Sequence, residues 1–317
     1  MRVHAAPTAP TLLPMPEDVD RLVRLAAFTW LGDLVRRYGH AVPRRALEEG
    51  VPFRGERVRV IAQQGIFIPK GMTVPLSITT APERPGVPRP YEDEVGHDGL
   101  LRYRYRGTDP SHRENVGLRV AHAEQRPLVW FFGLVPALYH PVWPVYVVGD
   151  DPAALTFTVA SDMAGEVDTE VVPSPSLDAR RLYATAEVKR RLHQSQFRQR
   201  VLHAYRSACA ICNLRHGELL DAAHILPDGH PKGEPVVPNG LALCKIHHAA
   251  FDHHLIGVRP DLVVEVRQTL LDEEDGPMLR HGLQACHGQA LFVPHRRTDR
   301  PHPDFLEERY CLFREAG

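Results

Sequence analysis

The sequence predicts an α+β protein of two domains, in which one long helix joins a β-rich N-terminal domain to a smaller C-terminal domain. Three observations support this prediction. Short β-branched or aromatic runs dominate residues 57–160, a helical pattern runs from about Leu177 to Ser207, and closely spaced cysteine and histidine pairs follow from Cys209 onward. At 317 residues, the chain is long enough to bury two cores.

The N-terminal domain, which we place at residues 1–165, is predicted to begin with a helix. Apolar residues recur at helical spacing from Glu17 to Tyr38, and Gly39 ends the pattern. Seven short runs separated by Gly, Pro and Asp then predict a β-barrel or sandwich. The predicted strands are Arg57–Ala62, Gly65–Ile68, Val74–Thr80, Leu100–Arg106, Leu128–Pro136, Val142–Gly149 and Leu155–Ala160.

A linker and a helix are predicted to connect the two domains. Hydrophobic density falls before Pro173, so we expect the linker at residues 166–176 and the C-terminal domain at 177–317. Phe197, Val201 and Tyr205 then recur at four-residue steps, as on one face of a helix. Near the C-terminus, a strand is expected at 262–266 and a helix near 305–313.

Positive charge is concentrated in the segment of the long helix. Between Ser176 and Ser207, eight residues are basic and two are acidic, although the whole chain has a net charge of −1. Local charge matters more than the total when a protein contacts phosphates. Arg190 and Arg198 are therefore candidates for contacts with DNA.

Two short pairs of residues predict a zinc site. Cys209-x-x-Cys212 alone is compatible with a redox pair, but Cys244-x-x-His247 follows thirty-two residues after Cys212 and completes a four-ligand set. Such a set closes a tetrahedral structural zinc site and leaves no open position for chemistry. We therefore expect the zinc to stabilise the fold.

Three polar residues lie between and just after these pairs. They are His224, Asn239 and His248, in the order His, Asn, His, and each lies in a suitable context. A strand-like run ends at His224, a turn into apolar residues begins at Asn239, and a helical pattern contains His248. His224 alone would be interpreted as a histidine at the end of a strand whose hydrogen bonds are satisfied. The combination resembles the HNH, or ββα-metal, nuclease motif, in which a zinc-stapled unit carries a one-metal phosphodiesterase site.

The resemblance implies a role for each residue of the motif. His224 is expected to be the general base that activates water, because a neutral imidazole is available near pH 7. Asn239 is expected to orient His224 or to fix the loop that holds it, and His248 to bind a divalent cation such as Mg²⁺. The products are expected to carry 5′-phosphate and 3′-hydroxyl ends.

One position departs from the HNH pattern and leaves the second cation ligand open. Many HNH enzymes carry an acidic residue or a histidine directly before the base, where this chain has Ala223. Asp252 lies four residues after His248, on the same helical face, and is our first candidate. Asp221 is the second. The alternative for Asp252 is a cap or salt bridge of its own helix. A histidine with a carboxylate suits Mn²⁺, Co²⁺ or Ni²⁺ at least as well as Mg²⁺.

An aromatic and arginine-rich strand follows an Asp-Gly turn in the N-terminal domain. It resembles the characteristic segment of SRA/YDG-type domains, PUA-like barrels that flip a modified cytosine out of DNA. His97 replaces the tyrosine that this family has before Asp-Gly, and Tyr103 and Tyr105 also fit half-buried strand residues. The candidate DNA-binding residues here are Asp98, Tyr103, Tyr105 and Arg106.

The two resemblances together are typical of modification-dependent restriction endonucleases. We therefore expect a homodimer that cleaves double-stranded DNA containing 5-methylcytosine or 5-hydroxymethylcytosine. Two alternatives stay open: an HNH nuclease for phosphorothioate-marked or mobile-element DNA, and a zinc-stapled DNA-binding module without activity. The sequence has no apparent signal peptide or membrane span, and three of its five cysteines belong to the zinc pairs, which favours the cytoplasm.

Overall fold

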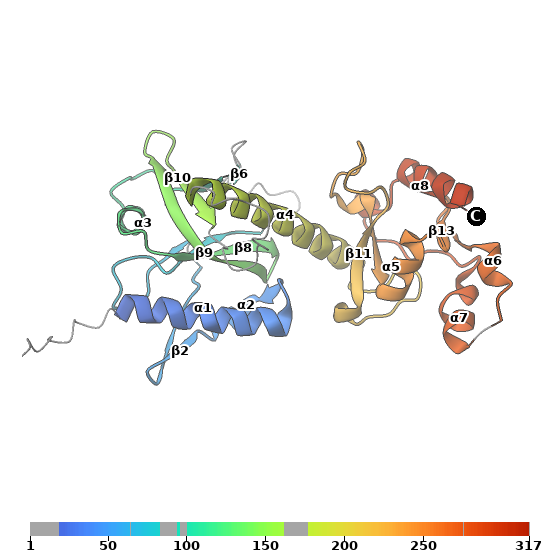
Figure 1. Cartoon of the computed structure of the whole chain (residues 1–317), viewed down its shortest axis with the longest axis horizontal. Coiled ribbons are helices and arrows are strands. Elements are labelled where there is room, and N and C mark those ends of the chain that lie inside the picture. Colours follow the sequence, from blue (N-terminus) through green and yellow to red (C-terminus); the bar gives the residue numbers. More distant parts are fainter. Residues whose placement is uncertain are drawn as a thin grey trace, which may run out of the picture.

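The computed structural model describes residues 19–63, 65–82, 94–95, 100–161, 177–274 and 276–316. It confirms the α+β class and contains two lobes that are connected by helix α4 (Leu177–Ala204) (Figure 1). The predicted linker at 166–176 lies outside the described residues, as does Asp98. No helix within the described ranges is long and apolar enough to cross a bilayer.

The N-terminal lobe is built on an eight-stranded curled sheet that forms a half-barrel. Its strand order is β4-β5-β8-β9-β10-β7-β6, with β1 paired to β9. The strands are β1 (Val42–Pro43), β4 (Ile66–Phe67), β5 (Ser77–Thr80), β6 (Glu94–Val95), β7 (Leu101–Arg104), β8 (Leu128–Val135), β9 (Leu138–Asp151) and β10 (Thr156–Ser161). Most neighbours are antiparallel, while β5 and β8 are parallel.

Both faces of the sheet are buried. Along β8, Trp130 and Phe132 point into one core, and Phe131 between them points into another. The first core is completed by Val188 and Leu192 of α4. Helix α1 (Val19–Tyr38) completes the second core, so the sheet lies between these two helices (Figure 1). Burial on both faces explains why β8 is a continuous apolar run.

Several elements of the N-terminal lobe were not predicted from the sequence. They are α2 (Arg44–Glu48), β2 (Val51–Phe53) and α3 (Arg113–Ala123). Strand β2 pairs with β3 (Glu56–Val58), which covers only the start of the strand predicted at Arg57–Ala62. Helix α3 has an internal Gly117, which lowers its helix propensity. A Cβ atom at Gly117 would lie 2.9 Å from Cδ of Pro75, so the glycine allows close packing of α3.

Helix α4 belongs to both cores. Its first half packs on the sheet through Val188 and Leu192, and Phe197 and Val201 lie in the core of the C-terminal lobe. The observed bounds agree with the predicted helix to within three residues at the C-terminal end. Arg206 and Ser207, both with φ near +50°, then turn the chain toward Cys209.

The C-terminal lobe is organised around a ββα unit. Strands β11 (Leu220–His224) and β12 (Gly240–Cys244) pair antiparallel, and α5 (Lys245–Asp252) follows directly. The remaining elements are η1 (Gly217–Leu219), η2 (Val237–Asn239), β13 (Ile256–Val258), β14 (Val264–Val266), α6 (Gln268–Leu271), α7 (Pro277–Gly282), η3 (Gln284–Cys286), η4 (Arg297–Asp299) and α8 (Pro303–Ala316). The predicted C-terminal strand and helix correspond to β14 and α8.

Candidate metal centre and active site

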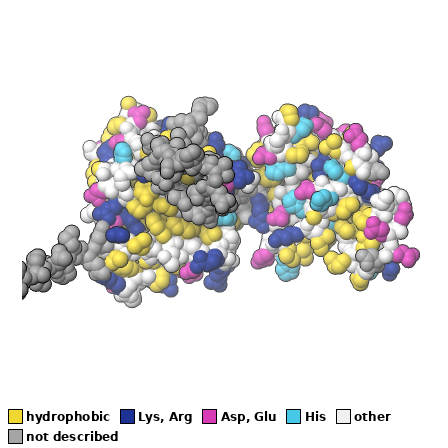
Figure 2. All heavy atoms as spheres, in the orientation of Figure 1, with side chains coloured by type: hydrophobic (Ala, Val, Ile, Leu, Met, Phe, Trp, Pro, Cys, Tyr) yellow, Lys and Arg dark blue, Asp and Glu magenta, His cyan; other side chains and the backbone are white. Residues whose placement is uncertain are grey.

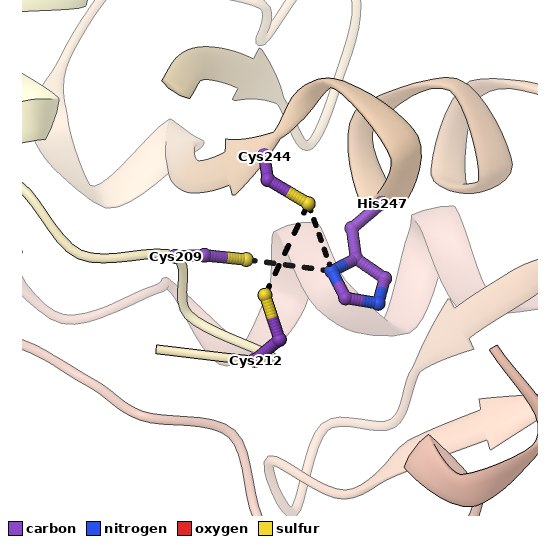
Figure 3. Close-up of side chains that lie close together, drawn as sticks. All are labelled: Cys209, Cys212, Cys244 and His247. Atoms are coloured by element: carbon purple, nitrogen blue, oxygen red, sulfur yellow. Dashed lines mark hydrogen bonds between the residues drawn. The ribbon is translucent and has the colours of Figure 1, made fainter. Parts of the chain in front are cut away.

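The four predicted zinc ligands converge at one point. Cys209 and Cys212 lie in the loop after α4, Cys244 ends β12, and His247 lies in the first turn of α5. Their ligand atoms all lie within 4.8 Å of one another, and the side chains point toward a common centre (Figure 3). Among the described residues, this is the one cluster of at least three such side chains with that spacing.

The geometry of the cluster fits a tetrahedral metal ion. His247 Nδ1 lies 3.5 Å from Cys209 Sγ and 3.2 Å from Cys244 Sγ, and Cys212 Sγ lies 4.0 Å from Cys244 Sγ. Four ligands at zinc distances would be about 3.5–3.8 Å apart. A set of three thiols and one imidazole is a common set for structural zinc. The sequence pattern therefore corresponds to a preformed Cys₃His metal site.

Neighbouring groups orient these ligands. The Nε2 atom of His247 lies 2.8 Å from the carbonyl oxygen of Gly282, which fixes the ring so that Nδ1 faces the cysteines. Hydrogen bonds from Cys244 and His247 lower the pKa of Cys209 well below its usual range, so its thiolate form is favoured. Cys286 is buried and lies 3.6 Å from the far side of His247.

His224 is the last residue of β11 and is positioned from both sides of the strand. It pairs with Gly240 of β12, and its ring stacks on Phe197 of α4 with centroids 4.0 Å apart and planes at 16°. A Cβ atom at Gly240 would lie 2.4 Å from Val201, so a glycine is needed where α4 crosses the sheet. The long helix therefore forms one wall of the site.

The environment of His224 favours the neutral ring. Burial is the largest effect and lowers its pKa. Asp228 opposes it, and His248 (lowering) and Asp252 (raising) have smaller effects. Its Nε2 atom is buried and has no hydrogen-bond partner in the described part of the chain. A neutral imidazole has one unprotonated ring nitrogen that can accept a proton.

Asn239 holds the loop that follows His224. Its side chain is fully buried, accepts a hydrogen bond from the backbone N–H of Leu226 at 2.9 Å, and donates to the carbonyl oxygens of Leu226 and Glu234 at 3.0 Å each. Its backbone carbonyl accepts from Ile225 at 2.9 Å. Of the two roles predicted for Asn239, these contacts favour fixing the loop.

His248 lies between two carboxylates on the outer side of the ββα unit. Its Nε2 atom is 3.3 Å from Oδ2 of Asp252, and its Nδ1 atom is 3.7 Å from Oδ2 of Asp221. The structure therefore brings both candidate cation ligands to His248, one at each ring nitrogen. Figure 2 shows histidine, acidic and basic side chains gathered on one face of the C-terminal lobe.

Arg198, a candidate for DNA contacts, lies at this site. Its Nε atom is 3.4 Å from Oδ1 of Asp221, and it donates to the carbonyl oxygens of Leu220 at 2.7 Å and Gly217 at 3.1 Å. These contacts tie α4 to the start of β11. Arg190, the other candidate on α4, is exposed and forms a salt bridge with Glu187 at 2.8 Å.

The three described candidates of the N-terminal lobe do not form one cluster. Tyr103 lines a narrow crevice with about 30 Å³ of space for water, together with Trp130 and Phe132 of the sheet and Lys189 and His193 of α4. Tyr105 is buried, and its hydroxyl contacts Asp150 and Arg119. Arg106 forms a two-oxygen salt bridge with Glu114 at 2.7 and 2.8 Å. Of these three, Tyr103 alone lines that crevice.

Comparison with known proteins assigns the C-terminal unit. Residues 209–259 match the model of a family described as HNH endonuclease. No curated protein matches the chain. Among solved structures, a modification-dependent TagI restriction endonuclease aligns over 88% of this chain and 88% of its own, with 17% identity and a TM-score of 0.30. That TM-score does not establish a common fold.

Proposed function

We propose that the HNH endonuclease domain at residues 209–259, a phosphodiester hydrolase, cleaves double-stranded DNA that carries 5-methylcytosine or 5-hydroxymethylcytosine. The observation that carries the catalytic part is the placement of His224. Its partly buried imidazole has a lowered pKa, and it interacts electrostatically with His248 and Asp252. A base and a cation site are the two groups that hydrolysis of a phosphodiester requires.

His224 accepts the proton of the attacking water in this proposal. Stacking on Phe197 holds the ring in one plane, and Asn239 keeps the following loop in place. Because the ring is neutral near pH 7, no proton has to leave it before catalysis. The Cys₃His cluster, which we assign to structural zinc, holds the start of α5 and therefore also His248.

The pair of His248 and Asp252 fits a divalent cation. Two neighbouring ligands of an octahedral ion are about 3 Å apart, and Nε2 of His248 lies 3.3 Å from Oδ2 of Asp252. Asp221 faces the other ring nitrogen, where a carboxylate can accept the Nδ1 proton and orient the ligand. A cation bound there would supply positive charge to the phosphate and to the leaving 3′-oxygen.

Substitutions of His248 and Asp252 should show whether Asp252 is a ligand of the cation or a cap of α5. We expect His248→Ala to be inactive, and Asp252→Asn to lose most activity and to recover part of it at high Mn²⁺ concentration. Asp261→Asn is a matched control, because Asp261 and Asp252 side chains are equally exposed at 54%. A modest loss in Asp252→Asn without recovery at high Mn²⁺ would instead assign Asp252 to capping α5.

The N-terminal lobe is the reader of the modified base in this proposal, as a PUA/SRA-like domain. Tyr103, Trp130 and Phe132 give its crevice aromatic walls, and Lys189 and His193 add polar groups from α4. Aromatic walls with a few polar groups suit a flipped base, and the crevice, with about 30 Å³ of space for water, must open to admit one. Because Val188 and Leu192 complete the core of this lobe, an isolated reader should include α4 to about residue 193.

Binding should discriminate between modified and plain DNA. We expect full-length His224→Ala, which retains the reader, to bind a methylated or hydroxymethylated duplex more tightly by about 1–3 kcal/mol, the scale of one specific base contact. Tyr103→Ala in the same background should reduce this difference, while Tyr38→Ala, on α1, should not. Equal affinity for all duplexes would contradict a reader of modified cytosine.

Digestion of matched plasmids tests the function as a whole. The plasmids carry unmodified, methylated, hydroxymethylated or phosphorothioated DNA and are incubated with Mg²⁺ or Mn²⁺. We expect a homodimer to cut both strands of the methylated or hydroxymethylated plasmid. In the cell, we place the enzyme in the cytoplasm, where thiol ligands stay reduced. Cleavage of phosphorothioated DNA alone would favour the alternative nuclease, and cleavage of none would favour a binding module.

A further inference from the structure

The two carboxylate oxygens of Asp252 face different partners. Oδ2 lies 3.3 Å from Nε2 of His248, on the side of the proposed cation, and Oδ1 lies 3.9 Å from Nη2 of Arg309. Ligating carboxylates are commonly fixed by a second contact of this kind. Arg309 belongs to α8 and lies fifty residues beyond the end of the HNH family match at 259.

Arg309 itself is held firmly. Its residue exposure is 8%, its Nη2 atom donates to the carbonyl oxygen of Phe251 at 2.9 Å, and its guanidinium stacks on the Phe251 ring at 4.6 Å. Helix α8 is also tightly packed, because a Cβ atom at Gly257 would lie 2.6 Å from the ring of Phe313. The guanidinium is therefore a fixed positive charge beside α5.

Asp252, in contrast, is a half-exposed side chain at the end of its helix. An exposed carboxylate samples several rotamers, and ordering it for a ligand costs entropy. The fixed charge of Arg309 favours the rotamer in which Oδ1 faces the protein and Oδ2 faces His248. This arrangement leaves one oxygen for a cation.

We propose that Arg309 is a positioning residue that holds Asp252 in the orientation required for binding the catalytic cation. The inference rests on the proposed ligand pair of His248 and Asp252. Helix α8 thus becomes part of the active site, although it lies outside the ββα unit. Capping of α5 through the Phe251 carbonyl is the competing role, and it requires no effect on the cation.

Direct titration with Mn²⁺ distinguishes the two roles. Full-length, zinc-loaded protein is titrated by electron paramagnetic resonance, with Arg309→Met, Arg309→Lys and Arg314→Met compared with the unmodified chain. Loss of an outer-shell partner typically weakens metal binding about 10–100-fold. We expect a loss in this range for Arg309→Met, a smaller loss for Arg309→Lys, and none for Arg314→Met, an exposed arginine on the same helix.

A double-mutant cycle tests whether Arg309 acts through Asp252. We expect Arg309→Met to have no further effect on Mn²⁺ affinity when Asp252 is already asparagine. Unchanged affinity in Arg309→Met, or a full additional loss in the double variant, would overturn the inference. Unchanged affinity in Asp252→Asn would also overturn it, together with the ligand assignment.

Misfolding of a variant and failure of the proposed function can each be distinguished from a loss of Mn²⁺ binding. Zinc content and thermal unfolding of each variant are measured, and Arg309→Lys reports on the charge if Arg309→Met does not fold. Because Mn²⁺ binding needs no DNA, a failure to cleave modified DNA would contradict the proposed function and leave this result intact.

Discussion

Replacing His224 with alanine should reduce DNA cleavage about 10²–10⁴-fold, the usual contribution of a general base, and leave DNA binding within a few-fold. The side chain is half-buried against Phe197, and its Nε2 atom has no partner among the described residues, so its removal breaks no hydrogen bond of that atom. Single-turnover cleavage at saturating cation, measured beside gel-shift binding, checks both parts. His216→Ala, an exposed histidine outside the site, serves as the control.

The pH profile of the unmodified enzyme gives a second test of this base. The lowered pKa of His224 means that the neutral, active form persists below the ordinary histidine value of about 6.5. We therefore expect full single-turnover rates at pH 7 and a decline only as the pH falls below the ordinary histidine pKa.

Retention of more than about a tenth of the activity in His224→Ala would show that another group activates the water.

Replacing Cys212 with serine should remove the metal and unfold much of the C-terminal lobe. The Cys₃His cluster connects the loop after α4 to the end of β12 and the first turn of α5. Structural zinc contributes about 10–16 kcal/mol in small domains, which is comparable to the whole stability of a typical domain, about 5–15 kcal/mol. We expect one zinc per chain in the unmodified protein and none in the variant.

Metal analysis, calorimetry and limited proteolysis check this expectation. Cys311→Ser is a suitable control, because Cys311 is an exposed thiol on α8 outside the cluster. Chelation of the unmodified protein should reproduce the loss of structure. A metal-free protein with a cooperatively folded C-terminal lobe would contradict a structural role for the cluster.

The ββα unit was predictable because its information is local. The pairs at Cys209 and Cys244 have the spacing of zinc ligands, and a strand ending at His224 and a helix containing His248 have clear periodic patterns. The long helix was predictable for the same reason, since the core residues Phe197 and Val201 of α4 and Tyr205 just after it recur at four-residue steps.

Contacts between residues far apart in the sequence were not predictable. Phe197 was assigned only to a helix face, and nothing in its neighbourhood indicates that it stacks on His224. Arg309 lies 57 residues from Asp252, in a helix whose pattern reports burial and not its partner. In the same way, the salt bridge of Arg106 with Glu114 depends on α3, which the sequence pattern did not reveal.

The continuous helix α4 has a consequence for where DNA is cut. Leu192 is in the core of the N-terminal lobe and Phe197 is in the core of the C-terminal lobe, so about 7.5 Å of helix axis separates the two anchoring points. Such a short, stiff connection holds the two lobes at a fixed distance from each other. We therefore expect cleavage at a constant number of base pairs from the modified cytosine, and a shift of that number when whole helical turns are inserted between these two residues.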